Sequence, residues 1–398
     1  MNHFANIAKM VTASLPNWQA AHAEGLTGIR TVPGEGNSLT AADGHRFINM
    51  CSCSYLGLNL HPAITAGAIQ ALEQEGMIST SVSRARIAPR LLDETEALLR
   101  EVFRCDTLVA PSCFIASASV LPLLASGQFT DGAKPLMIFD GRCHFSMQIQ
   151  KACCADETEV VTSPHNDCAF IERACQTHAR VAYICDGAYS MGDNAPLAEL
   201  ARLQQRYGLF LFIDDSHSLS VSGPRGCGLA RAHFEQLNDR TIIVASLAKA
   251  FGATGGLIML SSRRQREMIV YCGGPLGWSQ MVSTAGLGAI RAAAKIHLGD
   301  ELPRLQQRLR DVMRCLDDAV PSANAGNGLP IRVFDLASIS DALSASRHLY
   351  LKGFYCSAVF FPIVARDRPG IRVMGRANMT RQDIDRFCAA IRTIVGGT

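Results

Sequence analysis

The sequence has few of the features that mark membrane, secreted or nucleic-acid-binding proteins. In 398 residues, no apolar run approaches the roughly 20 residues that a membrane-spanning helix needs. The first residues lack the long apolar stretch of a secretory signal. The net charge is only +3 and the basic residues do not cluster, so nucleic acid is not an expected partner.

The cysteines show no ordered spacing. There are 15 of them, an odd number, and no two are separated by the two residues of a C-x-x-C pair. This excludes a disulfide framework and a zinc ribbon, and no metal site is predicted. Most of these cysteines fit the role of small buried hydrophobes, and a reducing cytoplasm is the expected compartment.

The composition is that of a folded globular protein. Hydrophobic residues make up 48% of the chain and charged residues 18%. The length suits one large domain with a smaller one. We predict an N-terminal segment over residues 1–55, a large domain over 56–285 and a small C-terminal α/β domain over 286–398.

Strands and helices are predicted to alternate through the large domain. Most of the strands are continuous apolar runs, as expected when helices cover both faces of a parallel sheet. The predicted strands are 107–111, 136–140, 159–163, 181–186, 209–214, 241–246 and 256–261, and the helical stretches include 145–154, 167–178 and 197–207. In such an α/β layered domain ligands bind at the carboxyl ends of the strands, where Asp186, Asp214 and Ser246 fall.

The C-terminal part has its own pattern. A long helix is predicted after about residue 285, followed by a strand at 329–335, a helix at 340–351 and a strand at 370–375. The final helix begins after Thr380, which is expected as its N-cap.

Lys249 is the most informative residue. It follows the apolar strand 241–246, with Asp214 and His217 a few tens of residues upstream. A lysine in a buried setting is a common nucleophile or Schiff-base former. An acid, a histidine and such a lysine are the parts that a pyridoxal phosphate (PLP) site needs, although a surface lysine that closes a strand is the simpler alternative.

A phosphate also needs a cradle, which residues 111–124 could provide. This segment leaves a strand and enters a helix of small residues, with Ser112 as the expected N-cap. The backbone amides of Cys113 and Phe114 would then point at an anion. A capped helix without any ligand is an equally good interpretation.

The chain resembles the α-oxoamine synthases, a branch of the fold type I PLP enzymes. The resemblance rests on an ordered series of segments rather than on any single one. These segments are 54–64, 140–147, 186–197, 212–229, 246–252 and 370–374. The resemblance implies a mainly parallel seven-stranded sheet flanked by helices, a smaller C-terminal α/β domain and a homodimer.

The resemblance also implies a role for each matched residue. Lys249 would form the Schiff base, Asp214 would pair with the pyridine nitrogen, and His144 would stack on the ring. The ring oxygen would be bound by His217 and Ser190, and the phosphate by Ser246 with the Cys113 and Phe114 amides after Ser112.

The substrate residues implied by the resemblance are Arg372, for the carboxylate of an amino acid, and Ser54. Alternatives remain for several of these residues. His144 could be a core histidine, Ser190 a turn residue and Arg372 part of a surface salt bridge.

The implied reaction is a decarboxylative condensation of an α-amino acid with an acyl thioester. It would release carbon dioxide and a free thiol and leave an α-amino ketone. The amino acid, the acyl chain and the carrier, either coenzyme A or an acyl carrier protein, are left open. Rival interpretations are an aminotransferase or a C–S lyase, a dinucleotide-binding oxidoreductase based on the glycines of 223–228, and a non-catalytic partner subunit.

The sequence departs from the family pattern at three places. Cys53 and Ser54 stand where many relatives carry asparagine and aspartate. The family's glycine-rich stretch is replaced by 77–90, which has no glycine, as in the quorum-signal synthases. Gln280 stands where a threonine usually binds the phosphate across the subunit interface. We also expect three arginines of the glycine-free segment to line the access route of the acyl carrier, namely Arg84, Arg86 and Arg90. A solvated face without a ligand is an equally good interpretation of these arginines.

Overall fold

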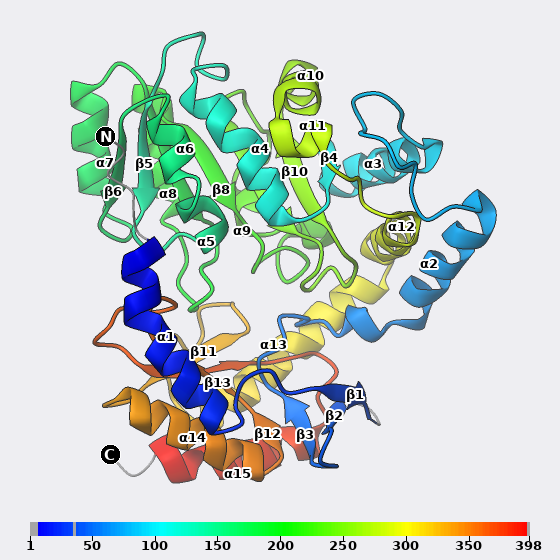
Figure 1. The fold of residues 1–398 in the computed structure, drawn as a ribbon, viewed down its shortest axis with the longest axis vertical. Helices are drawn as coiled ribbons and strands as arrows, with labels where there is room; N and C mark the ends of the chain where they lie inside the picture. Colours follow the sequence, from blue (N-terminus) through cyan, green and yellow to red (C-terminus); the bar gives the residue numbers. More distant parts are fainter. Residues whose placement is uncertain (1–6, 35–36, 396–398) are drawn as a thin grey trace. The chain divides into compact units, whose positions relative to one another are not determined.

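The computed structural model describes residues 7–34 and 37–395, which form two compact units. Figure 1 labels many of their helices and strands. The larger unit comprises residues 56–190 and 194–306. The smaller unit comprises the described residues up to 55, residues 191–193 and those from 307 onward. This division differs from the three predicted segments, because 7–55 group with the C-terminal residues and the larger unit extends beyond 285. Of the predicted segments, residues 1–6, 35–36 and 396–398 lie outside the described residues.

One seven-stranded sheet forms the larger unit, in the order β4-β10-β9-β8-β7-β5-β6. Its strands are β4 (Asp106–Ala110), β5 (Leu136–Asp140), β6 (Val160–Ser163), β7 (Val181–Asp186), β8 (Phe210–Asp214), β9 (Thr241–Ser246) and β10 (Gly256–Leu260). Strand β10 pairs antiparallel with both of its neighbours, and the other pairs are parallel. The expected mainly parallel sheet is confirmed.

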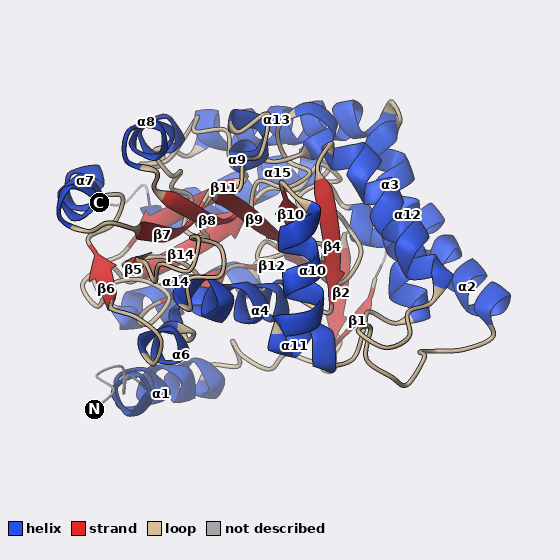
Figure 2. Cartoon of the chain, turned by 90° about the horizontal axis from the view of Figure 1, so that it is seen from above, coloured by secondary structure: helices blue, strands red, loops and turns tan. Residues whose placement is uncertain are grey.

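Helices cover both faces of this sheet, which explains why its strands are apolar throughout. Helices α4 and α10 lie on one side and α7 and α8 on the other (Figure 2). Every residue of β5, β7, β8 and β10 is buried. The helices of this unit are η1 (Leu58–Leu60), α2 (Pro62–Glu75), α3 (Arg90–Phe103), α4 (Cys113–Ala125), α5 (Phe145–Gln148), α6 (Lys151–Ala155), α7 (Cys168–Thr177), α8 (Leu197–Tyr207), η2 (Pro224–Gly226), α9 (Leu229–His233), α10 (Arg263–Cys272), α11 (Gly274–Trp278) and α12 (Thr284–Leu298).

The helical stretch predicted over 145–154 is two short helices, α5 and α6. Between them the amide of Gln150 donates to the carbonyl of Met147, three residues back, at 2.9 Å. Such a bond tightens the turn and ends the regular α-helical pattern. The sequence carries no proline or glycine there that would have signalled the break.

Two small sheets and several helices form the smaller unit. The sheets have the orders β1-β2-β3-β12 and β11-β14-β13. The elements are α1 (Ile7–Ala23), β1 (Thr31–Pro33), β2 (Ser38–Ala41), β3 (Arg46–Asn49), β11 (Ile331–Asp335), α14 (Ile339–Leu351), β12 (Phe354–Tyr355), β13 (Ser357–Val359), β14 (Gly370–Met374) and α15 (Arg381–Val395), and α13 (Glu301–Ala319) crosses from the larger unit.

Helix α15 begins as the sequence predicts. The hydroxyl of Thr380 accepts from the amide of Asp383 at 3.1 Å, and the Asp383 carboxylate accepts from the Thr380 amide at 3.2 Å. This reciprocal pair satisfies two amides at the start of the helix. Among the described residues, no helix is long and apolar enough to cross a bilayer.

Candidate active site

Three parallel strands of the larger unit end in polar residues at one edge of the sheet. Strand β7 ends at Asp186, β8 at Asp214 and β9 at Ser246. Asp186 and Asp214 are direct partners in the register of their strands. The carboxyl edge of the sheet therefore gathers these residues, as a parallel sheet requires.

Asp214 is held in place by contacts to both carboxylate oxygens. The residue is only 4% exposed. Oδ1 accepts from the backbone amide of Ser216 at 3.0 Å, and Oδ2 lies 3.5 Å from the thiol of Cys113. A buried carboxylate with this support can present one fixed edge to a cationic partner.

Asp186 is a second buried carboxylate beside it. Its Oδ1 accepts from the backbone amide of His144 at 2.9 Å. Burial, together with the charge of Asp214, raises the pKa of Asp186 well above its usual range. Asp186 was expected at a strand end but not among the site residues. The sequence could have indicated its place in the site, because the neighbouring parallel strand also ends in an aspartate.

Lys249 and His217 meet at this edge. The Nζ of Lys249 lies 2.9 Å from Nε2 of His217, whose ring is buried. Lys249 sits in a tight turn after β9, in which the amide of Gly252 donates to the Lys249 carbonyl at 3.0 Å. Gly252 has φ +83°, and a Cβ there would lie 2.4 Å from the Cβ of Leu58. The turn that presents the lysine therefore requires glycine.

The start of α4 forms an anion cradle. The Ser112 hydroxyl accepts from the amide of Ile115 at 3.2 Å, as expected of an N-cap. The amides of Cys113 and Phe114 belong to the first turn, where no carbonyl lies one turn back to accept them. A Cβ on Gly256 would lie 2.5 Å from the Cys113 nitrogen, so the strand β10 approaches this helix end closely. These amides and the positive end of the helix fit a phosphate group.

His144 and Ser190 lie in loops after β5 and β7. His144 is exposed and caps α5, with its Nδ1 accepting from the amide of Ser146 at 3.2 Å. The contact with Asp186 thus fixes the backbone of His144 and leaves its ring on the surface. Ser190 is half-buried at the end of the segment that follows Asp186.

The two residues expected to bind substrate, Arg372 and Ser54, belong to the smaller unit. Arg372 lies on β14 opposite Val333 and Ser357, and Ser54 is buried. The segment containing Ser54 runs beside β14, because the Met374 amide donates to the Met50 carbonyl at 2.8 Å. Burial raises the pKa of the Cys51 thiol to about 12, against the opposing charge of Arg372. The guanidinium and this segment are therefore neighbours.

The expectation that Arg84 lines an access route is wrong. Arg84 is buried, and its guanidinium donates to Glu96 at 3.0 Å and to the carbonyl of Val109 at 2.9 Å. Glu96 is fully buried and also pairs with Arg266. A buried carboxylate needs such cations, so Arg84 serves the core.

The other residues expected at the access route or at a subunit interface lie on the surface. Arg86 is exposed and stacks over the ring of Trp278 at 5.2 Å, and Arg90 pairs with Glu94 at 3.0 Å. Gln280 is exposed just after α11. The expected contact of Gln280 across a subunit interface stays a prediction.

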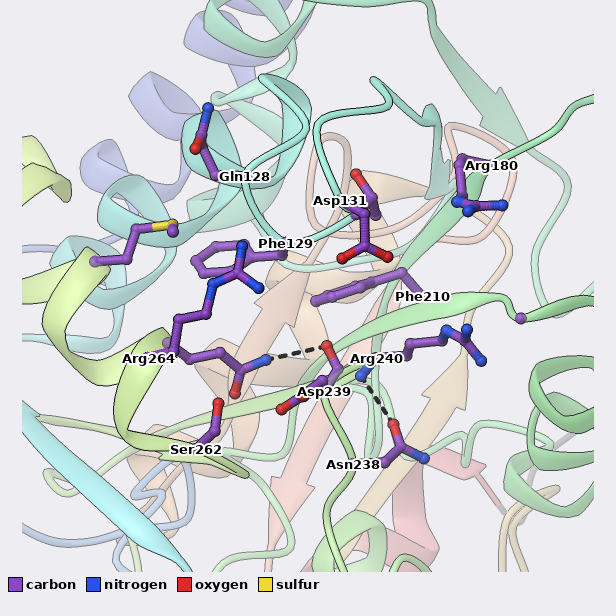
Figure 3. Close-up of a pocket in the computed structure, with 14 residues that line it drawn as sticks. Gln128, Phe129, Asp131, Arg180, Phe210, Asn238, Asp239, Arg240, Ser262 and Arg264 are labelled. Atoms are coloured by element: carbon purple, nitrogen blue, oxygen red, sulfur yellow. Dashed lines mark hydrogen bonds between the residues drawn. The ribbon is translucent and has the colours of Figure 1, made fainter.

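A separate cavity of about 330 Å³ opens at the other edge of the sheet (Figure 3). Its lining includes Arg180, Phe210 and Arg240, which stand at the starts of β7, β8 and β9. It therefore lies at the amino ends of the strands that carry Asp214 and Ser246 at their carboxyl ends. It is not part of the candidate site.

Comparison with known proteins identifies the family. The sequence profile of the Aminotransferase class I and II family matches residues 45–391. The chain belongs to this family. It is 29% identical over 377 residues to an 8-amino-7-oxononanoate synthase of Geobacter sulfurreducens, covering 92% of this chain and 93% of that protein. It is 27% identical over 354 residues to a serine palmitoyltransferase of Bacteriovorax stolpii, covering 87% and 82%.

The fold has the same relatives. A serine palmitoyltransferase structure from S. paucimobilis superposes with a TM-score of 0.82 at 19% identity, covering 96% of this chain and 97% of that one. These relatives are α-oxoamine synthases, so the resemblance seen in the sequence, and with it the class of PLP-dependent acyltransferases, is confirmed.

The buried position of Arg84 gives a first prediction. Arg84→Met leaves Glu96 with one cation fewer in the core, so we expect a loss of about 3 kcal/mol in the free energy of unfolding. The matched variant Arg86→Met, on the surface of the same segment, should change stability by much less. Thermal unfolding of both variants measures this, and equal midpoints would contradict the buried role.

Asp215 gives a prediction about pH. Its buried carboxylate accepts from the amide of Ala230 at 2.9 Å, and burial raises its pKa from 3.8 to about 6. Because the folded protein holds this proton to higher pH than the unfolded chain, the contribution of Asp215 to stability falls as pH rises from about 4 to 6. The loss amounts to about 3 kcal/mol above that window.

Asp215→Asn keeps an oxygen acceptor for the Ala230 amide and removes the titration. We therefore expect the variant to gain stability relative to the parent protein between pH 4 and pH 6. Thermal unfolding across this range measures the difference, and parallel pH profiles of the two proteins would show that Asp215 does not titrate there.

Proposed function

We propose that this chain is a PLP-dependent α-oxoamine synthase that condenses an α-amino acid with an acyl thioester. The observation that carries the proposal is the amine of Lys249 at 2.9 Å from the His217 imidazole, one strand beyond the buried carboxylate of Asp214. Family membership supports it, since the relatives named above are enzymes of this class.

The residues of the larger unit fit PLP along its whole length. Lys249 would hold the aldehyde, and Asp214 would pair with the ring nitrogen. His217 and Ser190 would bind the ring oxygen, and His144 would lie against the ring. The phosphate would sit at the start of α4, bound by the amides of Cys113 and Phe114 with the hydroxyl of Ser246.

PLP, when bound, supplies an aldehyde for amines and a ring that accepts the electron pair left on an amino-acid α-carbon. The residues of the chain then move protons. Lys249 takes the α-proton as a general base and returns one to the same carbon. The His217 imidazole, whose Nε2 lies 2.9 Å from this amine, would restrain the position of the lysine side chain. The carboxylate of Asp214 stabilises positive charge at the ring nitrogen.

The overall change balances with two substrates and three products. The α-carbon forms a bond to the acyl carbon, and the thioester C–S bond breaks to release the thiol. The carboxylate carbon leaves as carbon dioxide, and a proton takes its place. Arg372 would bind the carboxylate of the amino acid before it is lost, and Ser54 would contact the substrate.

An aminotransferase or a C–S lyase is the second candidate, because the matched family is named for aminotransferases. Such enzymes need the same residues around the ring. They differ in products, since neither releases carbon dioxide together with a free thiol from a thioester.

We further propose that the chain works as a homodimer in a reducing cytoplasm. The larger unit exposes Ile78, Ile87 and Trp278 by 68%, 61% and 59%, which is apolar surface that a second copy could cover. All fifteen cysteines are free, as suits a reducing compartment.

The Schiff-base lysine can be tested directly. The purified protein with PLP should absorb near the visible edge, and borohydride should fix the cofactor on Lys249, as located by mass spectrometry of peptides. Lys249→Ala should lose the labelled peptide, whereas Lys295→Ala, on an exposed helical position, should keep it. Labelling spread over other lysines in both variants would refute the assignment.

The reaction class needs a product assay. We expect the protein, given a panel of amino acids and acyl thioesters, to release carbon dioxide and free thiol in equal amounts with one pair. Lys249→Ala should release neither. A keto acid formed from the amino acid, with the thioester intact, would favour the aminotransferase instead.

A further inference from the structure

The side chain of Cys113 contacts the carboxylate that the proposed function assigns to the ring nitrogen. Its thiol lies 3.5 Å from Oδ2 of Asp214. This position of the thiol is separate from the role of the Cys113 amide in the phosphate cradle. The two residues are 101 positions apart in the sequence, so the contact exists only because α4 starts beside the end of β8.

Ser216 holds the thiol from the other side. Its hydroxyl donates to the Cys113 sulfur at 3.6 Å and accepts from the backbone amide of Ser246 at 2.8 Å. Its own amide donates to Oδ1 of Asp214 at 3.0 Å. Ser246, Ser216, Cys113 and Asp214 are thus connected by four hydrogen bonds, and each donor has one acceptor.

The direction of this chain of hydrogen bonds is fixed at both ends. The Ser246 amide can only donate and the Asp214 carboxylate can only accept. The hydroxyl and the thiol between them must therefore each accept from the first side and donate toward the second. The thiol can donate because burial and the nearby Asp214 charge raise the pKa of Cys113 well above its usual range, so the sulfur keeps its proton.

We propose that Cys113 and Ser216 are positioning residues that fix the Asp214 carboxylate for the pyridine nitrogen. The proposal rests on the proposed function in so far as it takes PLP as the ligand of Asp214. With Oδ1 tied to the Ser216 amide and Oδ2 to the thiol, the carboxylate is held in one orientation before the cofactor binds. The cofactor then loses less free energy in ordering its partner.

The same chain of hydrogen bonds joins the two ends of the proposed cofactor site. Ser246 and Cys113 stand at the proposed phosphate end, and Asp214 stands at the ring-nitrogen end. A phosphate that orders the start of α4 also orders the thiol, and through it the carboxylate. We therefore expect the two ends of the site to favour one ligand that reaches both of them.

The test compares two substitutions of Cys113 that separate packing from hydrogen bonding. Cys113→Val keeps an apolar side chain of similar bulk but neither donates nor accepts. Cys113→Ser keeps the donor and the acceptor but loses apolar volume. The dissociation constant of PLP, measured by absorbance titration of the cofactor-free protein, is the readout, and Cys154→Ala is the control because Cys154 is a buried core cysteine elsewhere in the same unit.

We expect Cys113→Val to weaken PLP binding about three- to tenfold, the effect of one lost hydrogen bond of ordinary strength, because a thiol is a weak donor. Cys113→Ser should stay within about twofold of the parent protein, and Cys154→Ala should bind as the parent does. Ser216→Ala should weaken binding in the same direction, and combining it with Cys113→Val should add little, because both break one chain.

The opposite order, with valine binding normally and serine weakened, would show that Cys113 only packs and would overturn the proposal. Equal dissociation constants for all variants would overturn it as well. If the parent protein itself binds no PLP, the proposed function fails first, so the two failures are distinguishable.

Discussion

The structure of the site depends on one constraint, the burial of the Asp214 carboxylate at the end of a central strand. A charge removed from water has to be compensated by hydrogen bonds and by a cation. The backbone amide of Ser216 and the thiol of Cys113 supply hydrogen-bond contacts to the two oxygens of Asp214. A second carboxylate, Asp186, is its direct partner on the adjacent strand, and burial together with the charge of Asp214 raises the pKa of Asp186.

Much of the fold could be predicted from the sequence, because its central strands are continuous apolar runs between helices. Burial on both faces demands that pattern, and the strand ends at Asp186, Asp214 and Ser246 followed from it. The orientation of β10 did not follow, since an apolar run reads the same in either direction. The grouping of residues up to 55 with the C-terminal part also depends on contacts between distant segments, such as the parallel pairing of β3 with β12.

The side-chain contacts of the site were less accessible to sequence reasoning. Lys249, Asp214 and His217 could be selected because their residue types and order carry a chemistry. The contact between the side chains of Cys113 and Ser216 could not be predicted, because a thiol and a hydroxyl 103 positions apart carry no pattern until the fold joins them. The gathering of Asp186 and Asp214 at one edge of the sheet follows from the register of the parallel strands.

The charge of a residue alone does not predict whether its side chain is buried, as the segment 77–89 shows. Arg84 reads as a surface residue in the sequence, but its partner Glu96 lies in the next helix and faces inward. The inward arginine ties the middle of this glycine-free segment to the core, and the Thr284 amide ties its start by donating to the Ile78 carbonyl at 3.0 Å. Arg86 then reaches the Trp278 ring on the outside.

Side-chain contacts thus fix the backbone conformation of this segment. A glycine-rich stretch adopts many conformations and loses more entropy when it is ordered, whereas this segment is ordered by an ion pair, a stacked ring and a backbone bond. The consequence is a fixed surface with Ile78 and Ile87 turned outward.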